Sequence, residues 1–189
     1  MDDGKVNRKV RYTRMVLRES LLELMETYDT ASISVKELCG KADINRATFY
    51  ANYKNIGELL HSIEEEVKAE LTTIFERSWL ERTKCEAVKM AKETLQYMVN
   101  HKSVMKVLLS HHSCPDFQKE LFDTFHRKTI TLMGSKKKPE TRTARYYTAF
   151  AMAGAAGIIR YWMESDMDMP IDTIAGMLTD LTGYLHEFK

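Results

Sequence analysis

Apolar residues recur at intervals of three and four along most of the chain, the spacing that places them on one face of an α-helix. No segment has the strict apolar–polar alternation that is typical of a half-buried strand. The pattern therefore predicts an all-α protein of about nine helices. The first helix is expected over 11–28, with an apolar face formed by Leu17, Leu21, Leu24, Met25 and Tyr28.

Polar residues mark where two short helices should begin. Ser34 and Glu37 have the spacing of a capping box, in which each side chain accepts a backbone N–H from the other residue, and they predict a helix over 35–42. Asn45 is a favourable N-cap and predicts a second helix over 46–52. Two short helices preceded by a longer one are typical of a helix-turn-helix.

A long helix should follow them, because Asn55 and Glu58 repeat the cap spacing before a further apolar period. Over 56–80 it would be roughly 37 Å long at 1.5 Å per residue, which is too long for a three-helix domain. We therefore expect an N-terminal helix-turn-helix domain over 1–57 and a C-terminal helical ligand-binding and dimerisation domain over 58–189, bridged by this helix.

After a linker at 134–139, the chain ends in two apolar helices, expected over 140–164 and 170–188. The first is apolar nearly all round and rich in small residues, so it must be covered on both sides. We expect both helices to pair with those of a second chain in a four-helix bundle; core packing within one chain is the alternative. The residues expected at this homodimer interface are Ala149, Ala153, Gly157, Trp162, Ile174, Leu178, Leu181 and Leu185.

Composition narrows the class of protein. The 189 residues are 44% hydrophobic and 29% charged, with a formal net charge of +1, which is typical of a folded globular chain. The longest uncharged stretch, between Arg145 and Arg160, is shorter than the ~20 residues that span a bilayer, and the N-terminus lacks the apolar core of a signal peptide. Three separated cysteines indicate neither disulfides nor zinc. We expect a cytoplasmic protein without a membrane partner.

The balanced net charge conceals a basic segment near the N-terminus. Between residues 5 and 18 there are six basic residues and no acidic one, a cluster that could meet a polyanion, although a solvated tail is the alternative. These residues are Lys5, Arg8, Lys9, Arg11, Arg14 and Arg18.

The second short helix carries side chains suited to DNA. Ile44 and Phe49 can anchor its underside. Arginine is suited to a guanine edge or to phosphates, asparagine to an adenine edge, and hydroxyl groups to phosphate oxygens. The side chains left outward are Arg46, Thr48, Tyr50 and Asn52.

The runs Ile33-Ser34-Val35-Lys36-Glu37-Leu38 and Ala42-Asp43-Ile44-Asn45-Arg46-Ala47-Thr48-Phe49-Tyr50-Ala51-Asn52-Tyr53-Lys54-Asn55 resemble the DNA-binding domain of the TetR family, over about residues 10–65. The resemblance implies a homodimeric bacterial transcriptional regulator, usually a repressor, which binds palindromic double-stranded DNA and is often released by a small-molecule effector. The positions it assigns to the DNA interface or its support are Ser34, Lys36, Asn45, Arg46, Ala47, Thr48, Tyr50, Asn52, Tyr53 and Lys54.

Three residues depart from that family's pattern. Asp43 replaces the usual turn glycine, and aspartate tolerates the left-handed region better than most residues. Asn52 stands where histidine is common. Ile56 stands where a lysine is frequent, so one phosphate contact would be lost or shifted to Lys54.

The effector would be a small hydrophobic molecule of unknown identity. Methionines in the second half offer adaptable surface for an irregular pocket, although such residues also fill ordinary cores. The candidate pocket residues are Met98, Leu109, Phe122, Phe125 and Met152.

Histidines and cysteines in this half give no metal prediction. His111, His112 and Cys114 lie at a break between helices without an evident fourth ligand, so a solvated loop is favoured over a metal site. His126 is expected to be a core histidine with its hydrogen bonds satisfied.

Catalytic signatures are missing from the sequence: there is no G-x-S-x-G, P-loop, dinucleotide fingerprint or H-E-x-x-H. We expect neither an enzyme nor a cofactor. The alternative is an all-helical ligand carrier or enzyme that does not bind DNA. A salt-dependent affinity for duplex DNA would separate the two.

Overall fold

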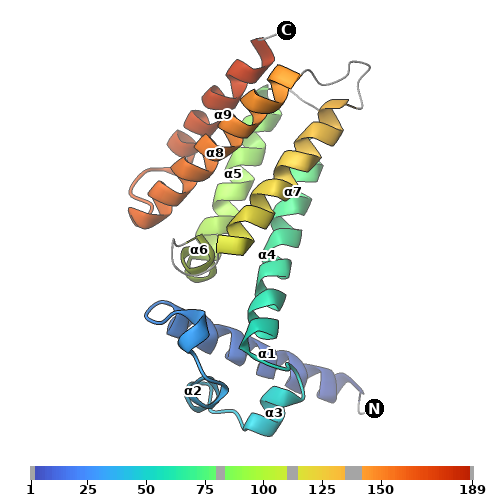
Figure 1. The fold of residues 1–189 in the computed structure, drawn as a ribbon, viewed down its shortest axis with the longest axis vertical. Coiled ribbons are helices and arrows are strands. Elements are labelled where there is room, and N and C mark those ends of the chain that lie inside the picture. The colour runs from blue at the N-terminus through green and yellow to red at the C-terminus, as the bar shows by residue number, and fades with distance from the viewer. Residues whose placement is uncertain (1–2, 80–83, 110–114, 135–141, 188–189) are drawn as a thin grey trace.

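The computed structural model describes residues 3–79, 84–109, 115–134 and 142–187 (Figure 1). Over these ranges the chain is all-α, as predicted, with nine α-helices and one short 3-10 turn. The elements are α1 (Asp3–Met25), η1 (Thr30–Ser32), α2 (Val35–Lys41), α3 (Arg46–Tyr50), α4 (Ile56–Trp79), α5 (Lys84–Asn100), α6 (Lys102–Leu109), α7 (Pro115–Gly134), α8 (Arg142–Glu164) and α9 (Ile171–Glu187).

The helices form two groups. Helices α1–α3 lie together at one end of the molecule and are called the head; α5–α9 lie toward the other end and are called the body (Figure 1). Helix α4 begins in the head and runs into the body beside α5 and α7, while α6 packs against α1. One continuous hydrophobic core extends from Leu17 and Phe49 in the head through Leu71 to Leu95 and Leu178 in the body.

The predicted caps position the short helices of the head. The Ser34 hydroxyl accepts from the backbone N–H of Glu37, and the Glu37 carboxylate accepts from the backbone N–H of Ser34 at 2.9 Å, which completes the capping box. The Ser34 hydroxyl also donates to the Glu37 carboxylate at 2.7 Å, and this hydrogen bond, together with the one from the Ser34 backbone N–H, lowers the pKa of the Glu37 carboxyl. Asn45 Oδ1 accepts from Ala47 N at 2.8 Å and opens α3. Asn55 Oδ1 accepts from Glu58 N at 2.9 Å at the start of α4.

The boundaries of the first helix differ from the prediction. It begins at Asp3 rather than near residue 11 and ends at Met25, so Tyr28 lies outside it and is exposed instead of buried. The predicted turn after α2 is confirmed in its conformation: Asp43 has a φ of 50°, in the left-handed region that favours glycine. The backbone strain expected of an aspartate at this position is thus present in the turn of the helix-turn-helix.

The connection between α8 and α9 is a second strained turn. Asp166 and Met167 both have positive φ, at 58° and 61°. The Asp166 carboxylate accepts from Lys102 and Lys106 on α6, each at 2.7 Å, and these hydrogen bonds lower its pKa to about 2. The turn between the last two helices is therefore fastened to α6, the helix that packs on the head.

The expected linker residues after Gly134, and His111, His112 and Cys114, lie outside the described residues. Among the helices that are described, none combines the length and apolarity needed to cross a membrane.

Candidate nucleic-acid interface

Helix α3 has one buried side and one exposed side. Phe49 is 0% exposed and packs beneath the helix, with its ring centroid 5.4 Å from that of Tyr50 and 6.1 Å from that of Tyr53. Tyr53 is half-buried, so it acts as a packing residue. On the other side Arg46 and Ala47 are exposed, and Tyr50 keeps 51% of its surface exposed. This arrangement leaves a rigid ridge of side chains facing solvent.

Three cations flank this ridge. Lys36 on α2, Arg46 on α3 and Lys54 before α4 are exposed, and within the described part of the chain none forms an ion pair. The backbone N–H of Lys54 donates to the Glu58 carboxylate, so its position at the start of α4 is fixed while its ammonium group faces solvent. Such a set is suited to phosphate oxygens.

Asn52 is placed differently from the prediction that it reads an adenine edge. Its Nδ2 donates to the Thr48 carbonyl oxygen at 2.9 Å, and its Oδ1 accepts from Arg14 Nε at 3.4 Å. Both ends of the amide are thus engaged within the head. Thr48 is half-buried, while Ser34 and Asn45 are exposed but serve as helix caps.

The basic segment of α1 is divided between solvent and internal contacts. Arg8, Lys9 and Arg11 are exposed. Arg14 donates to Asn52, and Arg18 pairs with Glu66 at 2.5 Å. The side chain of Lys5 lies outside the described part of the structure. Within the described residues, Arg8, Lys9 and Arg11 are therefore exposed, whereas Arg14 and Arg18 also make contacts inside the molecule.

The buried cysteine of the head has no role in this surface. Burial raises the pKa of the Cys39 thiol, against the opposing influence of the nearby Arg46 charge. The thiol is therefore protonated and unreactive at neutral pH.

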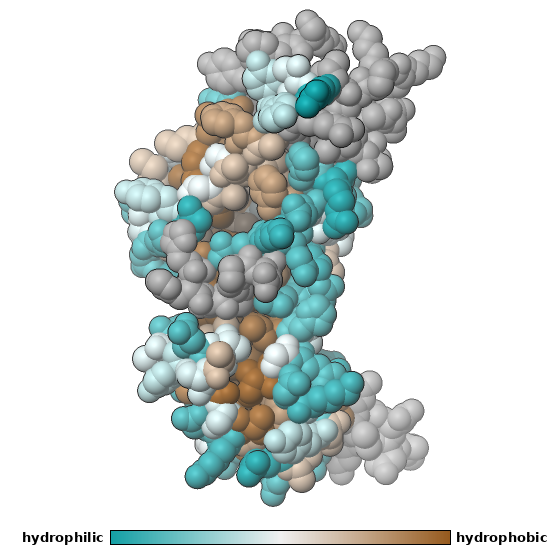
Figure 2. Space-filling model, viewed as in Figure 1, coloured by the Kyte–Doolittle hydropathy of each residue, from teal (hydrophilic) through white to brown (hydrophobic). Residues whose placement is uncertain are grey.

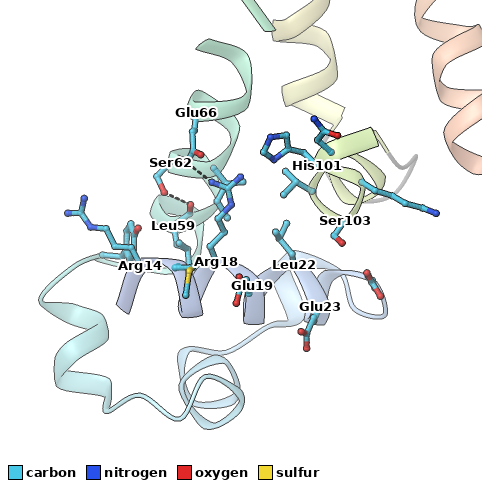
Figure 3. Close-up of a pocket in the computed structure, with 17 residues that line it drawn as sticks. Arg14, Arg18, Glu19, Leu22, Glu23, Leu59, Ser62, Glu66, His101 and Ser103 are labelled. Atoms are coloured by element: carbon cyan, nitrogen blue, oxygen red, sulfur yellow. Dashed lines mark hydrogen bonds and ion pairs between the residues drawn. The ribbon is translucent and has the colours of Figure 1, made fainter. Parts of the chain in front are cut away.

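A cleft of about 740 Å³ lies where the head meets the body (Figure 3). Its walls come from α1, the start of α4 and the α5–α6 corner, and they mix apolar and charged side chains. Arg18 and Glu66 meet across it, with Leu22 below and His101 on the α6 side. The cleft could not be predicted from the sequence, because its walls come from segments of α1, α4, α5 and α6 that are far apart along the chain and share no periodic signal.

The five residues predicted to form an effector pocket do not line the described cavities. Met98 is buried in the core, and Phe125 packs on Phe75 with ring centroids 5.2 Å apart. Phe122 stacks on His126 at 6.0 Å with an interplanar angle of 14°. The expectation that the hydrogen bonds of His126 are satisfied is not met among the described residues, which offer its buried Nε2 no hydrogen-bond partner.

The expected dimer residues divide into buried and exposed sets. Trp162, Ile174 and Leu178 are nearly fully buried within the single chain, and Trp162 Nε1 donates to the Met169 carbonyl at 2.9 Å, so these three belong to the core of one chain. Ala153 and Leu181 are exposed. Ala149 and Gly157 are half-buried, and the side chain of Leu185 lies outside the described part.

Large aromatic side chains are exposed on α8. Phe150 is 75% and Tyr161 is 72% exposed, and Tyr146 is also exposed on α8. Figure 2 shows apolar residues over this part of the body. An apolar surface of this kind on a soluble chain commonly marks an interaction site.

Residues 86–183 match the family model of a transcriptional regulator C-terminal region of the TetR type. This region is more than half of the chain, which therefore belongs to the TetR family of transcriptional regulators, a family of regulators and not of enzymes.

A relative from Bacillus subtilis (strain 168), the uncharacterized HTH-type transcriptional regulator YxbF, is 26% identical over 182 residues, which cover 92% of this chain. The chain spans only 45% of the length of that relative.

Solved structures share the fold. A TetR transcriptional regulator from Streptococcus agalactiae 2603V aligns with a TM-score of 0.67 and 14% identity, over 95% of this chain and 98% of its own. NalD, the secondary repressor of the MexAB-OprM efflux pump in Pseudomonas aeruginosa, gives the same TM-score and identity over 99% and 97%. FadR from Bacillus subtilis, in complex with stearoyl-CoA, aligns with a TM-score of 0.61 and 14% identity over 88% and 96%.

Proposed function

We propose that the chain is a cytoplasmic, homodimeric repressor that binds a palindromic DNA operator through α3. The observation that carries this proposal is the two-sided packing of α3, which buries Phe49 completely and leaves Arg46, Ala47 and Tyr50 facing solvent. The exposed Lys36 and Lys54 flank this surface. A helix so presented can enter a major groove, where Arg46 meets a base edge while Lys36 and Lys54 contact phosphates. Arg8, Lys9 and Arg11 add phosphate contacts from α1.

The proposed dimer forms through α8 and α9. Phe150 and Tyr161 on α8 and Leu181 on α9 supply exposed apolar surface that a second copy would cover. A two-fold pairing of these helices makes a four-helix bundle and presents two copies of α3. Two symmetric reading heads require two symmetric half-sites, so the operator should be roughly palindromic.

Release by an effector is supported by one orphaned polar atom in the body. His126 Nε2 is buried next to Phe122 and has no partner in the part of the chain that the structure describes, so an apolar molecule with one hydrogen-bonding group would satisfy it. The relative FadR was solved with stearoyl-CoA, which joins a long apolar chain to polar groups. Such a ligand would act only through its differential affinity for two conformations of the dimer.

Whether the chain represses or activates transcription needs its own measurement. NalD is named a repressor, whereas another fold relative, DhaS, is named an operon activator. A reporter gene placed behind the selected operator should rise when this chain is removed. A fall would make it an activator.

The decisive experiment selects fragments of duplex DNA bound by the full chain and then measures their affinity against salt. We expect a selected palindrome, a dimer at the binding concentration, and an affinity that falls steeply as salt rises. A dilute monomer, or equal and salt-insensitive affinity for all duplexes, would favour the alternative of a helical ligand carrier.

A further inference from the structure

Helix α3 has only five residues, and side-chain hydrogen bonds close both of its ends. So short a helix is marginal by itself, because the backbone groups at both ends lack intrahelical partners. At the N-terminal end, Asn45 Oδ1 accepts from Ala47 N. At the C-terminal end, the Asn52 backbone N–H donates to Phe49 O and not to the Thr48 carbonyl. The Thr48 carbonyl accepts from the side-chain Nδ2 of Asn52.

Asn52 also connects this end of α3 to α1. Its Oδ1 accepts from Arg14 Nε, a residue 38 positions away in the sequence. The hydrogen bond uses the Nε of the guanidinium, and the Arg14 side chain is otherwise exposed to solvent. One amide therefore fixes both the last turn of α3 and the direction of an arginine on the neighbouring helix.

We propose that Asn52 is a positioning residue that holds α3 and Arg14 in the DNA-binding geometry, and that base contacts are made by Arg46, Ala47 and Tyr50. The inference rests on the proposed function. An asparagine that reads adenine uses its side-chain oxygen and nitrogen together. Asn52 has both atoms engaged within the head, whereas Arg46 and Tyr50 are exposed on the ridge.

The test compares substitutions in the protein with substitutions in the DNA. After the wild-type chain has been used to select a duplex, its affinity is measured for that duplex and for versions with each base pair changed singly. The same series is then measured for Asn52→Ala, which removes both hydrogen bonds, and for Asn52→Asp, which keeps the acceptor for Arg14 and loses the donor to Thr48. Arg14→Lys keeps the charge and loses the Nε donor.

A loss of positioning should weaken the selected duplex about tenfold, as when the competent fraction falls to about a tenth. Each single base-pair change should then cost Asn52→Ala the same factor that it costs the wild type. The double variant Arg14→Lys with Asn52→Ala should be no weaker than Asn52→Ala alone, because both changes break one unit. The matched control, Arg77→Lys, makes the same charge-preserving change near the end of α4, away from the head, and should stay within about twofold of wild type.

Amide hydrogen exchange of the free protein supplies a second readout. In Asn52→Ala, exchange should accelerate in α3 and leave α5–α9 unchanged, whereas a general structural defect would accelerate exchange throughout.

Three results are distinguishable. Loss of discrimination at one base pair in Asn52→Ala would overturn the positioning role, as would multiplicative losses in the double variant. A wild-type chain without preference for any duplex would instead overturn the proposed function.

Discussion

Arg18 Nη1 lies 2.5 Å from Glu66 Oε2 and joins α1 of the head to the bridging helix α4. Glu66 is largely exposed, so the pair should contribute less than about 1 kcal/mol to the free energy of unfolding. Its larger role would be geometric, because the two heads of a dimer must match a fixed half-site spacing.

We therefore expect a double-mutant cycle of Arg18→Gln and Glu66→Gln to give a coupling of less than about 1 kcal/mol in stability but a several-fold loss of operator affinity. The matched control is the Lys41–Glu23 pair at 2.7 Å, which joins α2 to α1 within the head. Gln variants of this pair should change the angle between head and body less than Gln variants of Arg18 and Glu66 do, because Lys41 and Glu23 both belong to the head. Equal losses of affinity for both pairs would contradict the geometric role.

Arg46 and Lys54 should behave differently on substitution. Arg46→Ala should cost about 1–3 kcal/mol of binding free energy and relax preference at one base pair, as expected for a base contact. Lys54→Ala should weaken all duplexes alike and reduce the salt slope by about 1. Fluorescence titrations over a salt series measure both, with Lys89→Ala on the exposed side of α5 as the control. Uniform losses for both variants would remove base reading from Arg46.

Phe150 offers the sharpest test of the dimer. Phe150→Glu would place a charge in the proposed apolar interface, where an unpaired buried charge is strongly unfavourable. Analytical ultracentrifugation should then show a monomer, with a loss of operator affinity of about 100-fold or more if only one half-site can be held. Met169→Glu, an exposed apolar residue in the α8–α9 turn, should remain dimeric. A dimeric Phe150→Glu would move the interface elsewhere.

His126→Phe should stabilise the protein and impair its response to an effector. Within the described ranges the buried Nε2 has no partner, and a buried unsatisfied polar group costs about 1–3 kcal/mol. We expect a gain of about 1 kcal/mol in the free energy of unfolding, measured by urea denaturation. Weaker stability would mean that the imidazole makes a contact that phenylalanine cannot replace.

Asp166 should make stability depend on pH in a narrow acidic range. Its pKa in the folded chain is about 2 against an ordinary value of 3.8. The folded-state pKa is depressed, so its contribution is fully present above the unfolded pKa and is lost as pH falls from about 4 toward 2. Asp166→Asn should lower the Tm near neutral pH, and the difference from wild type should shrink across that range. A difference that is independent of pH would exclude the ionised contact with Lys102 and Lys106.

Local signals in the sequence account for most of the head. Ser34, Asn45 and Asn55 predicted three helix starts correctly, because a cap depends on residues only two or three positions away. The left-handed turn at Asp43 was predictable for the same reason.

Contacts between distant segments were not predictable. Asn52 was expected to be available to a base edge. Its contact with Arg14 could not be foreseen, because Arg14 lies 38 positions earlier and no local pattern links the two residues. Trp162 and Ile174 were assigned to a dimer because they lie on apolar helices, but apolar character does not distinguish burial within a chain from burial between chains. The cleft between head and body likewise exists only once α1, α4, α5 and α6 are assembled.

The unbroken core from Leu17 to Leu178 has a consequence for how the molecule unfolds. Because one cluster of buried apolar residues runs from the head into the body, heating should melt both in a single calorimetric transition. A fragment ending near residue 57 would lose the packing that α4 and α6 give to α1. The head and the body would then have different functions but would fold as one cooperative unit.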